Sequence, residues 1–161
     1  MSVRAAAVLV LIAFVLDRAT KVLVMQTMAV GQSIEVIPGF FSLTHVLNRG
    51  AAFGLLADQG PWHDVFLVVV AIVATVVLGW LFWQLDASLR WQRAAAAAVM
   101  AGALGNLYDR VVYGSVVDFL DVFVGDWHWP AFNVADSCIT VGVVVLVIAS
   151  FRDADVPATT G

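Results

Sequence analysis

The stretch VFLVVVAIVATVVLGWLFW, residues 65–83, decides the class of fold. Thr75 is its one polar side chain, and Trp80 and Trp83 near its end are of the residue type enriched where a membrane meets water. A bilayer core about 30 Å thick needs about 20 mostly apolar residues of helix to cross it. The stretch therefore predicts a membrane-spanning helix.

The composition of the whole chain agrees with this prediction. Of its 161 residues, 62% are hydrophobic and 12% charged, against about 45–50% and about 25% in soluble domains. The formal net charge is -4, but the acids form no tail or acidic face, so we expect no nucleic-acid partner. A single cysteine, Cys138, excludes an intrachain disulfide and a CxxC metal site. We expect one domain over residues 1–161.

Three further windows, roughly 4–24, 94–112 and 132–151, approach the length of a span but contain polar residues. Basic residues lie at one end of these windows, and such residues favour the cytoplasmic side; they are Arg4, Arg90, Arg93 and Arg152. We therefore expect four spans with both termini in the cytoplasm. A second group of basic residues lies on the opposite side and weakens this assignment of orientation; it comprises Arg18, Lys21, Arg49 and Arg110.

The outer segment of about 26–62 contains two runs, residues 33–37 and 41–47, that alternate partly with period two. Pro38 and Gly39 supply a turn between them, so we expect a small outer β-sheet. The aromatic segment of about 113–131 is expected to lie at the membrane interface. The predicted fold is an all-α membrane protein of four transmembrane helices with a small extracytoplasmic sheet.

Ionisable side chains gather at the outer ends of the predicted spans, where they are retained mainly if they are paired or functional. Asp17 and Lys21 have the i, i+4 spacing of a helical ion pair, and structural pairing is the favoured interpretation. Asn106, Asp109 and Arg110 share one helical face. We expect Arg110 to hold Asp109 ionised, so that Asp109 braces the structure and does not catalyse.

Asp118 and Asp136 differ because each is embedded among apolar residues without a basic neighbour. Desolvation favours the protonated form of such carboxyls, and two that meet share one proton. One could then deprotonate water while the other protonates a carbonyl oxygen. The residues alone leave structural alternatives open, in which Asp118 caps a helix and Asp136 bonds to a neighbouring span.

Other functions have less support in the sequence. The three histidines, His45, His63 and His128, lack the paired spacing of a zinc site and are expected at the surface or the interface. Intramembrane acids could also serve a proton-coupled carrier, although they cluster at one face and no inverted repeat is evident. A structural subunit would not explain the concentration of acids and amides.

Four motifs occur in order along the chain: NRGAAFG (48–54), GALGNLYDR (102–110), GSVVDF (114–119) and FNVADS (132–137). Together they resemble the lipoprotein signal peptidase (signal peptidase II) family over nearly the whole chain. Where that family commonly has two glycines before the ALGN run, this chain has Ala101 and Gly102.

The resemblance implies an aspartic endopeptidase of the bacterial inner membrane, with its active site near the periplasmic face. Its substrates would be prolipoproteins, cut just before a cysteine that already bears diacylglycerol. The resemblance assigns catalysis to Asp118 and Asp136, and it implies an outer sheet that cradles the lipopeptide. It places five residues around the substrate or the catalytic pair: Asn48, Gly50, Asn106, Arg110 and Asn133. We expect neither metal nor cofactor, contact with membrane lipids, and a monomer.

Overall fold

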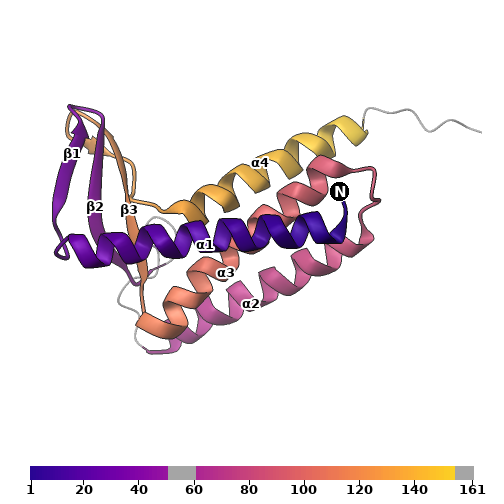
Figure 1. The fold of residues 1–161 in the computed structure, drawn as a ribbon, viewed down its shortest axis with the longest axis horizontal. Coiled ribbons are helices and arrows are strands. Elements are labelled where there is room, and N and C mark those ends of the chain that lie inside the picture. The colour runs from indigo at the N-terminus through magenta and orange to yellow at the C-terminus, as the bar shows by residue number, and fades with distance from the viewer. Residues whose placement is uncertain (51–60, 155–161) are drawn as a thin grey trace, which may run out of the picture.

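The computed structural model describes residues 1–50 and 61–154, and motif residues 51–54 lie outside this part of the chain. Its helices are α1 (Val3–Thr27), α2 (Pro61–Gln84), α3 (Arg90–Tyr113) and α4 (Val134–Ala154). Its strands are β1 (Ser33–Ile37), β2 (Phe41–Asn48), β3 (Val116–Val124) and β4 (Trp127–His128). Figure 1 shows the strands beyond one end of the helical bundle, the end at which α1 finishes and α4 begins.

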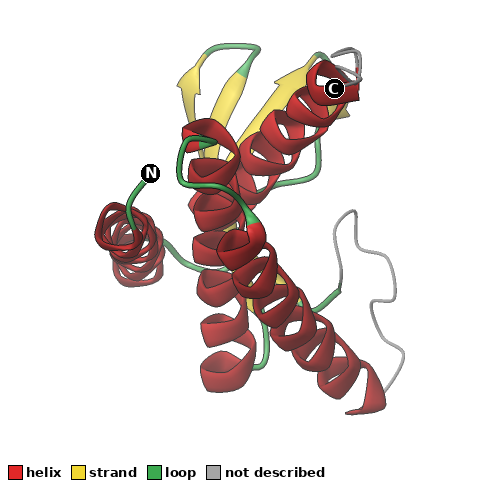
Figure 2. Cartoon of the chain, turned by 90° about the vertical axis from the view of Figure 1, so that its right-hand side faces the viewer, coloured by secondary structure: helices red, strands yellow, loops and turns green. Residues whose placement is uncertain are grey.

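Helix α3 is the centre of the bundle, because it packs against α1, α2 and α4, while α1 and α2 barely touch (Figures 1 and 2). Small residues permit the close packing. A Cβ added at Gly105 would lie 2.6 Å from Asp17 Oδ2 of α1, and one at Gly142 of α4 would lie 2.7 Å from Ala95 O of α3. The glycines therefore set how closely the helices approach each other.

The burial pattern is the reverse of that in a soluble protein. Asp17, Lys21 and Asp109 are at most 1% exposed, whereas Val65 and Val76 on α2 are 64% and 66% exposed. Soluble proteins almost never bury charged side chains fully unless they are paired, and they seldom expose large apolar surfaces. An apolar environment around the helices accounts for the exposed apolar side chains.

Among the described residues, two helices are long and apolar enough to cross a membrane, through Val65–Gln84 of α2 and Val134–Phe151 of α4. The first matches the stretch that predicted a span. Helices α1 and α3 have 25 and 24 residues, comparable lengths, but they carry the charged side chains of the bundle interior.

The four strands form one antiparallel sheet in the order β1-β2-β3-β4. The predicted hairpin of β1 and β2 is confirmed, and Gly39 adopts φ 73° in its turn. For segment 113–131 the sequence predicted only an interfacial position, and the structure places β3 and β4 there. The first four residues of β3 are all buried, so they show no alternation that would indicate a strand.

The histidines were expected at the surface or the membrane interface, but His45 is buried inside the structure. Its side chain is 4% exposed, and its Nδ1 lies 2.9 Å from Met28 O at the end of α1. His128 is exposed as expected and lies 2.9 Å from Asp121 Oδ1, while the side chain of His63 lies outside the described part. None of these residues belongs to a group of three or more that could hold a metal ion among the residues described.

We expect Gly105→Ala to lower the free energy of unfolding by about 1–3 kcal/mol, because the new methyl group would overpack the contact between α3 and Asp17. Thermal unfolding of the purified protein in detergent measures the change. Gly79→Ala is the matched control, since its Cβ would lie 3.8 Å from Met100 Cε. That variant should be unchanged or more stable by up to about 1 kcal/mol, and equal loss in both variants would contradict the packing argument.

Candidate active site

A group of buried charges joins α1 to α3. Lys21 Nζ lies 2.9 Å from Asp17 Oδ2 and 2.9 Å from Asp109 Oδ2. Arg18 Nη1 pairs with the other oxygen of Asp109. Two acids and two bases thus neutralise one another, which is what burial of charge requires.

This group corrects the expected partner of Asp109. The sequence pointed to its neighbour Arg110, but the basic partners of Asp109 come from α1, because a helix turns adjacent side chains in different directions. The guanidinium of Arg110 instead donates to Gly50 O at 3.2 Å. Arg18 is the residue that sequence reasoning missed, although it directly follows Asp17. Its guanidinium also stacks on the ring of Tyr108, 4.5 Å from the centroid.

The same buried acids also accept hydrogen bonds from the backbone of the two elements that carry the candidate catalytic acids. Asp17 Oδ1 accepts a hydrogen bond from Ala135 N at 2.9 Å, in the first turn of α4 and one residue before Asp136. Asp109 Oδ2 accepts from Val117 N at 3.3 Å, one residue before Asp118 on β3. The acids are therefore positioned through the backbone beside them.

Asn106 links Lys21 to Asp136 through hydrogen bonds on both sides of its amide group. Lys21 Nζ donates to Asn106 Oδ1 at 3.0 Å, and an ammonium group can only donate. The amide oxygen must therefore face Lys21, and the amide nitrogen is turned away to donate to Asp136 Oδ1 at 2.8 Å.

Asn133 is oriented in the same manner by the start of α4. Asp136 N donates to Asn133 Oδ1 at 2.9 Å, while Asn133 N donates to Asp136 Oδ2 at 3.3 Å. This reciprocal pair has the geometry of a capping box. Because the backbone donor occupies its oxygen, Asn133 turns its nitrogen to Asp118 Oδ1 at 2.7 Å.

Asn48 completes the set from the end of β2. Its Oδ1 accepts from Gly50 N at 2.9 Å, which leaves its Nδ2 to donate to Asp118 Oδ2 at 2.9 Å. Gly50 in turn accepts from Arg110 through its carbonyl oxygen. Three amides, at the end of β2, within α3 and just before α4, thus direct N–H groups at two carboxylates.

Burial is the main influence on the pKa of Asp118, which is 2% exposed on the inner strand β3. Desolvation, followed by the negative charge of Asp136, raises the pKa of Asp118 to about 7. The hydrogen bonds from Asn48 and Asn133 act in the opposite direction but are weaker. A carboxyl of this kind can hold or release a proton near neutral pH, as general acid–base chemistry requires.

The structure brings the residues singled out in the sequence into one cluster at the sheet end of the bundle. Each is connected by the hydrogen bonds and ion pairs described above: Asp17, Lys21, Asn48, Gly50, Asn106, Asp109, Arg110, Asp118, Asn133 and Asp136. Asp118 does not cap a helix, since it lies within β3. Asp136 does bond to a neighbouring helix, through Asn106 of α3, and Asn133 donates hydrogen bonds to both Asp136 and Asp118.

Comparisons with known proteins agree on one group of relatives. The family model described as signal peptidase (SPase) II matches residues 9–152. A lipoprotein signal peptidase of Desulforapulum autotrophicum is 52% identical over 134 residues, covering 82% of this chain and 82% of the relative. One of Geobacter sulfurreducens is 50% identical over 144 residues, covering 89% of both.

Solved structures show the same relationship in three dimensions. A bacterial membrane enzyme determined by the in meso method at 2.3 Å resolution matches with a TM-score of 0.87 and 33% identity, covering 99% of this chain and 94% of the other. A second, at 1.9 Å resolution, matches with a TM-score of 0.80 and 36% identity, covering 94% and 95%.

We expect Lys21→Met to lower the free energy of unfolding by about 3–5 kcal/mol, because it leaves Asp17 and Asp109 buried with less compensation. Thermal unfolding in detergent tests this. Arg4→Gln removes an exposed cation from the same helix and should change stability by no more than about 0.5 kcal/mol. Similar stability of the two variants would show that Lys21 is not what holds the cluster.

Proposed function

This chain belongs to the signal peptidase II family of membrane proteases, and we propose that it removes signal peptides from bacterial prolipoproteins by aspartic catalysis. The proposal rests on the pair of acids, Asp118 and Asp136, which accept hydrogen bonds from side-chain amides. The orientation of each amide is fixed by a donor to its oxygen atom. Curated relatives named lipoprotein signal peptidase support the substrate class.

The surroundings of the two acids assign them different roles. Asp136 lies in the first turn of α4, where the helix N-terminus stabilises negative charge, and it accepts hydrogen bonds from Asn106 and Asn133. We assign to it the ionised state that deprotonates the attacking water. Asp118, with its pKa raised to about 7, holds the proton and delivers it to the carbonyl oxygen of the scissile peptide.

Oriented amides suit this chemistry because they need no rearrangement when charge moves between the acids. Preorganised donors stabilise developing charge without the cost of reorganising solvent. Gly50 follows the end of β2 and donates to Asn48, and Arg110 of α3 donates to the carbonyl oxygen of Gly50. We assign Gly50 and Arg110 to binding of the peptide backbone near the cleaved bond.

The position of the site fits a substrate that arrives from the membrane. A prolipoprotein brings an apolar signal helix and two acyl chains, and we place the cut just before the cysteine that bears them. The proposed arrangement has four spans in one domain of residues 1–161 in the inner membrane. Arg4, Arg90 and Arg93 lie at the bundle end opposite the sheet, so both termini are cytoplasmic and the sheet is periplasmic. The enzyme acts as a monomer without metal or cofactor.

We expect Asp118→Asn and Asp136→Asn each to abolish cleavage of a diacylglyceryl precursor peptide while the protein still folds, because each removes one acid–base partner. Product formation measured by mass spectrometry reports turnover. Asp121→Asn, on the same strand and paired with the exposed His128, is the matched control and should retain activity. The same peptide without lipid should be a poor substrate. Near-normal turnover by either dyad variant would contradict the mechanism, and equal cleavage of both peptides would contradict the substrate class.

The pH dependence of kcat/KM tests the role of Asp118. Its raised pKa keeps the carboxyl protonated below about pH 7, so kcat/KM should fall as the pH rises above about 7. The hydrogen bond from Asn48 favours the ionised form of Asp118. Asn48→Leu should therefore raise the pKa of Asp118 and move this decline to higher pH, while Asp121→Asn leaves it in place. A decline that moves to lower pH in Asn48→Leu would refute the assignment.

A further inference from the structure

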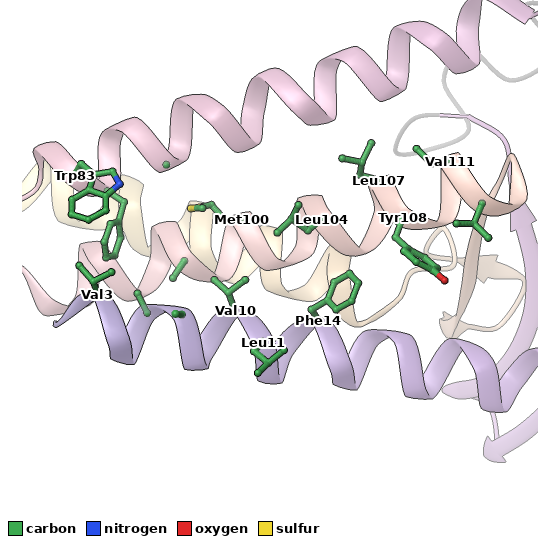
Figure 3. A pocket seen from close by; sticks show the side chains of 16 residues that line it. Val3, Val10, Leu11, Phe14, Trp83, Met100, Leu104, Leu107, Tyr108 and Val111 are labelled. Carbon is green, nitrogen blue, oxygen red and sulfur yellow. The ribbon is translucent and has the colours of Figure 1, made fainter.

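An apolar groove of about 720 Å³ runs between α1 and α2 with α3 as its floor. Figure 3 shows Val10, Leu11 and Phe14 of α1 along one side, with Met100 and Leu104 of α3 between the outer helices. The groove exists because α1 and α2 barely touch. It is separate from the candidate active site, since Leu104 and Asn106 are two residues apart and so project about 200° apart around α3.

The size of the groove favours a narrow apolar occupant. Its α3 residues extend from Ala97 to Val112, a length of about 22 Å at the rise of an α-helix. A helix of that length and about 10 Å diameter needs roughly 1,700 Å³, more than twice the available volume. A signal helix would only rest on the groove, whereas an extended hydrocarbon chain fits within it. The groove, at about 22 Å, is longer than the roughly 15 Å that one leaflet contributes to the bilayer core.

One end of the groove carries positive charge. Arg4 follows the lining residue Val3, and Arg90 begins α3; both side chains are exposed. No carboxylate among the described residues forms an ion pair with either of them or with Arg93. Asp86, the acid of the link between α2 and α3, accepts a hydrogen bond from Ser88 N at 2.8 Å. The arginines outnumber this acid, so this end of the groove has a net positive charge.

Arg93 connects this charge to the groove wall. It is 6% exposed, and its guanidinium stacks 4.3 Å above the ring of Phe82, which lines the groove. Its Nη1 donates to Met1 O at 2.8 Å, while its Nε has no hydrogen-bond partner in the described part of the chain. A buried cation that lacks a paired acid is costly, and an anion beside it would lower that cost.

We propose that this groove binds one acyl chain of an anionic phospholipid, with the lipid phosphate against Arg4 and Arg90 and the fixed charge of Arg93 behind them. The lipid comes from the leaflet at the end of the bundle opposite the sheet. Its chain fills the space between α1 and α2 and so supports α1, the helix that supplies Asp17 and Lys21 to the charge cluster. This proposal does not depend on the proposed peptidase reaction.

Native mass spectrometry of the purified full chain, titrated in detergent with dioleoylphosphatidylglycerol or dioleoylphosphatidylcholine, tests the site. The two lipids have identical chains and differ in headgroup charge. We expect one phosphatidylglycerol to bind at least tenfold more tightly than phosphatidylcholine. Ala7→Trp places a bulky side chain in the groove and should weaken phosphatidylglycerol binding at least tenfold. Ala5→Trp, exposed on α1 outside the groove, is the matched control and should bind as the unaltered chain does.

A double variant, Arg4→Gln with Arg90→Gln, tests the headgroup contact without filling the groove. It should lose most of the preference for phosphatidylglycerol over phosphatidylcholine, because only the charge of Arg93 remains at this end. Equal affinity of the unaltered chain for the two lipids would overturn the proposal, as would undiminished binding by Ala7→Trp. One-for-one displacement of phosphatidylglycerol by a diacylglyceryl precursor peptide would also overturn it, because the groove would then belong to the substrate.

Discussion

The ammonium group of Lys21 fixes where the main elements of the structure meet. It is fully buried and lies between Asp17 of its own helix and Asp109 of α3. A charge buried in this way is tolerated only with opposite charges and hydrogen bonds around it, so α1 and α3 must meet at this level. The two acids then bind the backbone at Ala135 and Val117, which sets the start of α4 and of β3.

The geometry of the acid pair follows from this arrangement through hydrogen-bond direction. Each of the three asparagines has a donor at its oxygen: Lys21 for Asn106, a backbone N–H for Asn133, and another for Asn48. An amide so constrained presents its nitrogen on the other side, where the carboxylates lie. Supporting groups that lock the orientation of catalytic side chains are what a precise site needs. The charged cluster therefore helps to fix the two acids, through Asn106 and through the backbone beside them.

The bundle has its charged side chains inside and its apolar side chains outside, the reverse of a soluble protein. Charges and amides occupy the interior near the sheet, while the sides of α1, α2 and α4 present aliphatic and aromatic residues. Packing around α3 depends on small residues, and α1 and α2 are left apart with an apolar groove between them. In a bilayer, lipid is the natural partner for such surfaces, since no hydrophobic effect would drive α1 against α2 there.

The sequence by itself determined the features that depend on neighbours along the chain. Apolar runs of sufficient length predicted the helices, the Pro38–Gly39 turn predicted the first hairpin, and the i, i+4 spacing predicted the contact of Asp17 with Lys21. Four ordered motifs indicated the family and both acids of the pair. Tertiary structure alone decided that β3 lies beside β2, that His45 is buried, and that Asp109 pairs with α1 and not with Arg110. These contacts join residues far apart in sequence, such as Asp17 and Ala135, and local periodicity carries no information about partners that only packing brings together.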